Sequence, residues 1–185
     1  SREPGLQSNA WYVAAMPGEV GRSLMRRVTL EEPIALFRRE DGSVAAIGDT
    51  CPHRFAPLSK GVLHGDVVEC PYHGLRFAAD GSCALNPHGP IVPNLRIRAY
   101  PVVERHSLIW IWMGDPALAQ ASAIPDLSYI DEHEVRRTVF AYIPARFRYD
   151  ILVDNLLDMA RAAYLHVGGF AAGPPQQART EVVDE

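Results

Sequence analysis

Short runs of apolar residues, many of them β-branched or aromatic, follow one another through the first two-thirds of the chain. Such runs predict β-strands when Gly, Pro, Asn and Asp punctuate them. Asp41-Gly42 and Asp80-Gly81 lie between neighbouring runs and are typical of tight hairpin turns. The expected strands lie at 11–14, 27–30, 34–38, 44–47, 66–69, 75–77, 82–85, 102–104 and 108–113. This pattern predicts a mainly β fold, a small antiparallel sandwich or barrel.

The pattern changes after the run 108–113. Within this run Trp110 and Trp112 share one face of the strand and apolar side chains occupy the other, so we expect both faces to be covered. The next stretch, 114–126, contains Asp-Pro, an Ala-rich piece and Pro-Asp, which is typical of a linker.

A second kind of pattern begins near residue 150. Apolar residues recur there with helical spacing, which predicts a helix at about 150–165. The tail at 171–185 shows no periodicity, and we expect it to have little structure of its own. We therefore expect two domains. Residues 1–120 are expected to form the β-sandwich domain, and 121–185 the incomplete N-terminal part of another domain.

Composition excludes several classes of function. The 185 residues carry a net charge of −4, with acidic and basic residues interspersed, which argues against a nucleic-acid surface or a polybasic membrane patch. No apolar run approaches the roughly 20 residues that cross a bilayer, and the polar start of the chain lacks the apolar segment of a secretory signal. Three cysteines are too few, and odd in number, for a disulfide scaffold, so we expect a cytoplasmic location. Cys83 is expected to be a small structural thiol.

Two short segments combine the ligand types of a metal centre. Cys51-Pro52-His53 and Cys70-Pro71-Tyr72-His73 each offer one thiolate and one imidazole, and each follows a predicted strand. Zinc sites usually pair like ligands, Cys with Cys and His with His, along the chain. The order Cys-His then Cys-His is instead typical of a Rieske [2Fe–2S] cluster, in which one iron takes both thiolates and the other both imidazoles. We therefore interpret Cys51, His53, Cys70 and His73 as cluster ligands, with zinc as the alternative.

This ligand set has a chemical consequence. Two neutral imidazoles in place of two thiolates remove negative charge near the cluster, so that it accepts an electron more easily, at roughly −150 to +300 mV. Tyr72 and the backbone amides of both segments are expected to tune this potential. The other histidines, His64, His88, His106 and His133, have no partner spacing and are expected to be surface or loop residues.

The chain resembles the Rieske non-haem iron oxygenases. The segments that carry the resemblance are Cys51-Pro-His-Arg-Phe-Ala-Pro-Leu-Ser59 and Cys70-Pro-Tyr-His-Gly-Leu-Arg-Phe77, with Asn9-Ala-Trp-Tyr-Val-Ala-Ala15, Asn86-Pro-His-Gly89 and Leu108-Ile-Trp-Ile-Trp-Met-Gly-Asp-Pro116 in addition. They are similar to the subgroup with vanillate demethylase, dicamba monooxygenase and toluenesulfonate methyl-monooxygenase. The resemblance implies a Rieske sandwich followed by the start of an α+β, START-like catalytic domain.

The resemblance also implies a mononuclear Fe(II) site on the predicted helix. Asn155, Asp158 and His166 fall on the family pattern, in which His166 would ligate the iron and Asp158 would be an electron bridge to a cluster histidine of a neighbouring subunit. Arg161 occupies the position of the other iron-binding histidine, and a guanidinium has no lone pair to give to a metal. The alternative is a surface ion pair between Asp158 and Arg161.

Three functions remain open from the sequence. In the first, the chain belongs to the terminal oxygenase of an aromatic monooxygenase or O-demethylase, a homotrimer that takes electrons from an NAD(P)H-dependent reductase or a ferredoxin and acts on a small aromatic acid. In the second, it is a stand-alone Rieske ferredoxin-like carrier. In the third, it is a catalytically inactive partner subunit.

Overall fold

The computed structural model describes residues 7–131, 142–143 and 148–158. The chain divides into two compact units, Ser1–Phe140 and Ala141–Glu185, and each is described by itself. The domain boundary expected after residue 120 stays a prediction.

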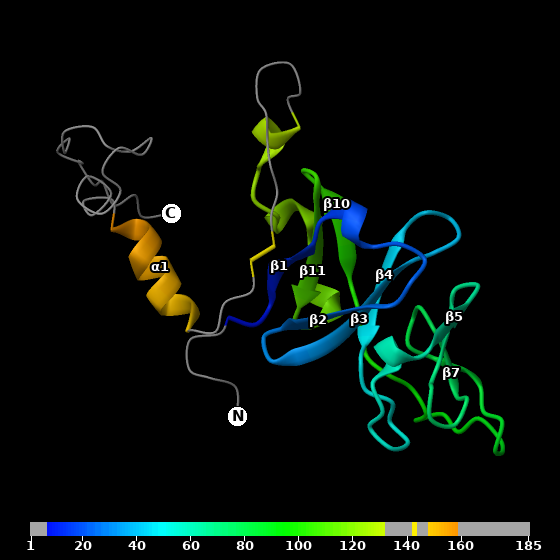
Figure 1. The fold of residues 1–185 in the computed structure, drawn as a ribbon. Helices are drawn as coiled ribbons and strands as arrows, with labels where there is room; N and C mark the ends of the chain where they lie inside the picture. Colours follow the sequence, from blue (N-terminus) through cyan, green and yellow to red (C-terminus); the bar gives the residue numbers. More distant parts are fainter. Residues whose placement is uncertain (1–6, 132–141, 144–147, 159–185) are drawn as a thin grey trace, which may run out of the picture. The chain divides into compact units, whose positions relative to one another are not determined.

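In the described part of the first unit, short strands form three antiparallel sheets (Figure 1). The first sheet, in the order β1-β11-β10, consists of β1 (Ala10–Ala15), β11 (Leu108–Met113) and β10 (Val102–Arg105). The second, β2-β3-β4-β9, consists of β2 (Met25–Thr29), β3 (Glu32–Arg38), β4 (Val44–Gly48) and β9 (Ala99–Tyr100). The third, β5-β6-β7-β8, consists of β5 (Val62–His64), β6 (Val67–Glu69), β7 (Arg76–Ala78) and β8 (Cys83–Leu85). The prediction of a mainly β, antiparallel fold is confirmed.

Strand β3 explains how one sheet serves two hydrophobic cores. Alternate side chains of a strand point to opposite faces. Ile34 and Leu36 join the core shared with the first sheet, whereas Ala35 and Phe37 join the core shared with the third sheet, and all four are fully buried. The partner strand β4 alternates in the same way. A continuous apolar run is therefore required in β3 and β4, because neither face of these two strands is exposed to water.

Both predicted Asp-Gly turns connect antiparallel strands, β3 to β4 and β7 to β8. Gly42 has φ of +85° and Gly81 has φ of +81°, a backbone region that side chains with a Cβ disfavour. At Gly81 space is also limiting, because a Cβ there would lie 2.1 Å from the carbonyl oxygen of Ile97. The hairpin predictions are confirmed.

The outer face of β11 is covered by the residues that follow it. Trp110 and Trp112 are buried, as expected, and Trp112 makes an edge-to-face contact with Trp11 at 5.4 Å between ring centroids. The stretch 115–131 contains three short 3-10 turns, η3 (Pro116–Leu118), η4 (Ala121–Ala123) and η5 (Ser128–Ile130). Trp11 Nε1 donates to the carbonyl oxygen of Gln120, and Ile124 is 3% exposed. The stretch 114–126, which was expected to be a linker, thus packs on the first unit. It shields the apolar face of β11 that carries Trp110 and Trp112 from water.

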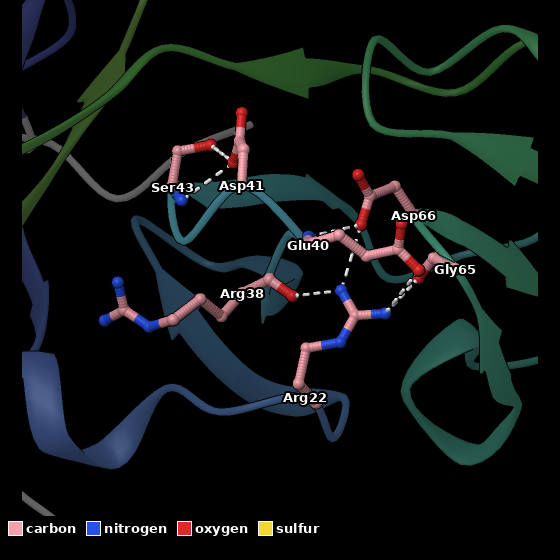
Figure 2. A network of polar contacts seen from close by, with 7 residues as sticks. All are labelled: Arg22, Arg38, Glu40, Asp41, Ser43, Gly65 and Asp66. Carbon is pink, nitrogen blue, oxygen red and sulfur yellow. Dashed lines mark hydrogen bonds and ion pairs between the residues drawn. The ribbon is translucent and has the colours of Figure 1, made fainter.

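A network of polar contacts joins the second sheet to the third (Figure 2). The Arg22 guanidinium donates to the carbonyl oxygens of Arg38 and Gly65, at 2.8 and 2.6 Å, and to the Asp66 carboxylate at 2.9 Å. Asp66 also accepts from the backbone N–H of Glu40 at 2.8 Å. The β3–β4 hairpin and the turn between β5 and β6 are therefore held together through Arg22 and Asp66.

The second unit contributes helix α1 (Tyr149–Leu157) to the described residues. The predicted helix at about 150–165 is confirmed for its first part, with Asp158 as the residue that follows the last helical turn. The rest of the predicted helix and the expected α+β continuation lie outside the described residues. Among the residues described, no helix is long and apolar enough to cross a membrane.

Candidate metal centre

The two predicted ligand segments form loops with the same backbone hydrogen bonds. The first follows β4 and the second joins β6 to β7. In the first loop Cys51 N–H donates to Ala56 O at 2.9 Å, and Phe55 N–H donates to Cys51 O at 2.9 Å. In the second loop the corresponding bonds join Cys70 to Leu75 at 2.8 Å and Gly74 to Cys70 at 3.1 Å. Each cysteine is therefore fixed at the start of a closed turn.

The fourth residue after each cysteine has the same unusual backbone conformation. Phe55 has φ of +58° and Gly74 has φ of +71°, both in the left-handed region. Glycine adopts this region without strain, whereas a phenylalanine does so at a cost of about 1–2 kcal/mol. Phe55 is 78% exposed, so the fold gains no core packing from its ring in return. The backbone of the first loop is thus strained next to the candidate ligands, as is common at functional sites.

The two thiols lie inside the protein and next to each other. Cys51 and Cys70 are each 1% exposed and belong to the core between the second and third sheets. Burial raises the pKa of the Cys51 thiol, and the neighbouring Cys70 thiol raises that pKa further, while the backbone N–H groups of His53 and Arg54 donate to the Cys51 sulfur and oppose the rise. A metal cation at this position would compensate the buried thiolate charge.

The two imidazoles lie together at the surface. The rings of His53 and His73 are 4.6 Å apart between centroids, at an interplanar angle of 63°. His53 is exposed and His73 is half-buried. Partial burial lowers the pKa of His73, and the nearby His53 and His88 rings lower that pKa further. The His73 ring is therefore disposed to stay neutral, which is the form that binds metals.

Donor types and burial define two pairs, a buried thiol pair and a solvent-facing imidazole pair. Among the described residues, no three side chains of His, Cys, Asp or Glu are placed to hold one metal ion. A [2Fe–2S] cluster of the Rieske type uses one thiolate pair on one iron and one imidazole pair on the other. The residues present fit that group, with the sulfur ligands in the core and the nitrogen ligands facing solvent.

A buried carboxylate closes the first loop. The Asp49 side chain is fully buried and accepts from the backbone N–H and the hydroxyl of Ser59, at 2.5 and 2.8 Å. Arg26 Nε donates to the same carboxylate at 3.1 Å. These contacts join the two ends of the segment that carries Cys51 and His53. Sequence reasoning missed them, since no local motif links residues 26, 49 and 59.

A third loop contacts the second one. His88 Nε2 lies 2.8 Å from the carbonyl oxygen of His73, and the two rings are 5.9 Å apart at 84°. His88 was expected to be a surface residue without a partner; it is exposed, but it has one. His106 lies in the β10–β11 turn, a loop as expected, but it is buried at 8% exposure, and its Nδ1 lies 3.1 Å from an Asp131 carboxylate oxygen. His133 lies outside the described residues.

Comparison with known proteins identifies the first unit. The sequence profile of the Rieske [2Fe–2S] domain matches residues 10–100, which include both cysteine loops and every described strand except β10 and β11. Residues 10–100 are a Rieske [2Fe–2S] domain. The cofactor of this Rieske domain is accordingly a [2Fe–2S] cluster.

Longer relatives agree with this assignment. The oxygenase component of dicamba O-demethylase from Stenotrophomonas maltophilia is 51% identical over 161 residues, which are 85% of this chain and 47% of that protein. An iron-sulfur subunit of the toluene-4-sulfonate monooxygenase system of Comamonas testosteroni is 44% identical over 160 residues, 85% of this chain and 46% of that protein. A crystal structure of dicamba monooxygenase bound to dicamba has a TM-score of 0.80 at 51% identity, and covers 85% of this chain and 48% of that chain. The predicted resemblance to Rieske non-haem iron oxygenases is confirmed. The chain spans about half the length of these relatives.

The predicted mononuclear iron site is only partly within the described residues. Asn155 and Asp158 are exposed residues of the second unit, at the end of α1. His166 and Arg161 lie outside the described residues. Their roles, and the ligand roles of the four Rieske-domain residues, stay predictions.

Proposed function

We propose that Cys51, His53, Cys70 and His73 hold the cluster of the Rieske domain, and that the domain passes single electrons as part of the terminal oxygenase of an aromatic monooxygenase or O-demethylase. The observation that carries this proposal is the separation of ligand types, with two thiols 1% exposed and two imidazoles toward solvent. The cluster, when bound, accepts and returns one electron at a time.

The residues of the chain have distinct tasks in this proposal. Cys51 and Cys70 anchor the cluster inside the core, where water is excluded and the geometry is set by two closed turns. His53 and His73 form the exposed edge, so that electrons enter and leave on the imidazole side. The imidazoles of His53 and His73 would each keep one ring nitrogen that does not face the cluster, and a proton held or released there would couple proton movement to electron transfer on this edge.

The whole protein would work as one component of a system. We propose a cytoplasmic homotrimer that receives electrons from an NAD(P)H-dependent reductase or a ferredoxin and acts on a small aromatic acid. Similarity to the oxygenase component of dicamba O-demethylase and to the iron-sulfur subunit of the toluene-4-sulfonate monooxygenase system supports this proposal. A mononuclear Fe(II) completes the family reaction, and Asn155, Asp158 and His166 are the residues of this chain that would contribute to its site or to the electron path toward it.

The ligand assignment is tested by metal analysis of matched cysteine variants. We expect the purified chain to contain two irons and two acid-labile sulfides, no zinc, and an electron paramagnetic resonance signal on reduction. Cys70→Ser should abolish the signal and the colour, because metal binding and local folding are coupled. Cys83→Ser is the matched control and should keep both, since Cys83 is a half-buried thiol whose contact is the carbonyl oxygen of Leu85 at 3.4 Å.

Two outcomes would contradict the proposal. One is a colourless protein that contains zinc or no metal; the other is a Cys70→Ser variant that keeps the cluster. Iron content also tests the oxygenase part, because a third iron in the longest natural form of the protein indicates a filled mononuclear site. Two irons per chain in that form favour an electron carrier.

A further inference from the structure

The loop formed by residues 86–90 is braced against the second cysteine loop. Asn86 holds the loop in shape, because its side chain accepts from the backbone N–H of His88 at 3.1 Å and donates to the carbonyl oxygen of Pro90 at 3.0 Å. Pro87 packs over Gly74, where an added Cβ would lie 3.6 Å from the proline ring. His88 directly follows these two residues and therefore has a defined position although it is exposed.

The hydrogen bond from His88 to His73 has a defined direction. A carbonyl oxygen only accepts, so Nε2 of His88 must carry the hydrogen of the 2.8 Å contact with His73 O. This bond acts on the backbone of His73 and leaves the imidazole of His73 free. The imidazole itself is enclosed by three rings, with Tyr72 at 4.0 Å, His53 at 4.6 Å and His88 at 5.9 Å between centroids.

We propose that His88 is a positioning residue for the cluster ligand His73, an inference that rests on the proposed ligand role of His73. By fixing the carbonyl of His73, the His88 donor sets the direction in which the His73 imidazole leaves the backbone. The same donor directs the positive end of an N–H dipole toward the ligand loop, which stabilises the added electron. Loss of the His88 donor therefore lowers the midpoint potential of the cluster. It also changes the arrangement of the ligands around the cluster, which the g-values report.

Three substitutions at and near His88 separate the hydrogen bond from the ring contact. His88→Gln keeps a donor at the place of Nε2 and removes the ring, whereas His88→Phe keeps a ring and removes the donor. His64→Phe is the matched control, because His64 is an exposed histidine of β5 whose contact is Glu69 at 3.2 Å. The full chain with its cluster is compared at one pH by electron paramagnetic resonance, redox titration, iron content and circular dichroism.

We expect His88→Phe to shift the midpoint potential downward and to change the g-values, with iron content and circular dichroism unchanged. His88→Gln and His64→Phe should have the midpoint potential and the g-values of the unsubstituted protein. Loss of the cluster in His88→Phe together with its retention in His88→Gln also supports the proposal, since it shows that the donor holds the ligand in place. An unchanged potential and unchanged g-values in His88→Phe, or an equal effect in His88→Gln, would overturn it. An unsubstituted protein without the cluster would instead refute the ligand assignment of His73.

Discussion

Asp49 and Ser59 close the first cysteine loop through a double hydrogen bond to a fully buried carboxylate. The bond joins a residue at the end of β4 to one in the turn η2 (Leu58–Lys60), and the segment between them carries Cys51 and His53. A third donor, Arg26 Nε from β2, also contacts this carboxylate at 3.1 Å. The base of this loop is therefore fixed by a charged group that the sandwich itself supplies.

Asp49→Asn should destabilise the loop and speed loss of the cluster. The side-chain amide would bring an N–H group toward the donors of Ser59 or Arg26, and an unpaired buried polar group costs about 1–3 kcal/mol. We expect the free energy of unfolding to fall by about that amount, and iron release to a chelator to become faster. Denaturant titration and the decay of visible absorbance measure the two effects.

Asp41→Asn is the matched control for this substitution. Asp41 accepts from the backbone N–H and hydroxyl of Ser43, as Asp49 does from Ser59, but on the exposed β3–β4 turn. We expect iron release from Asp41→Asn to equal that of the unsubstituted protein. Equal effects of the two substitutions would show that the Asp49 contact has no special role in the loop.

Sequence patterns predicted those features that depend on residues close together in the chain. The Asp-Gly turns needed only their own two residues and the strands beside them, and the cysteine and histidine spacing indicated the [2Fe–2S] cofactor. Contacts between distant residues could not be predicted in this way. Asp49 with Ser59 and Arg26, His88 with His73, and His106 with Asp131 each depend on how sheets and loops pack.

The stretch 114–126 shows the same limit. Its Pro, Ala and Asp content is typical of a linker, because composition records propensity and not contact. Ile124 is nonetheless buried, and the stretch covers the outer face of β11. The two tryptophans of β11, which predicted that this face is covered, were the better guide.

Gly74→Ala should destabilise the second cysteine loop, while Phe55→Asn should be tolerated in the first. Both positions have a left-handed backbone, which costs alanine about 1–2 kcal/mol but suits glycine and, to a lesser degree, asparagine. Space does not decide the result at Gly74, because the nearest atom to an added Cβ is an ordinary 3.6 Å away. We expect the midpoint of denaturant unfolding to fall for Gly74→Ala and to stay level or rise for Phe55→Asn. A fall of similar size in both would mean that the ring of Phe55 stabilises the loop.

Asp131→Ala should loosen the stretch 116–131 from the β10–β11 turn. Asp131 accepts from the Ser107 hydroxyl at 2.8 Å and lies 3.1 Å from His106 Nδ1, so its removal leaves the buried imidazole without this partner. We expect a loss of about 1–2 kcal/mol in the free energy of unfolding and faster proteolytic cleavage between residues 116 and 131.

Asp126→Ala is the comparison, because the Asp126 carboxylate is 3.6 Å from His106 Nε2, beyond a hydrogen bond, and 77% exposed. Its cleavage rate should change less. If both variants are cleaved as slowly as the unsubstituted protein, the stretch 116–131 is held on β11 by apolar contacts such as that of the buried Ile124, and His106 does not hold it.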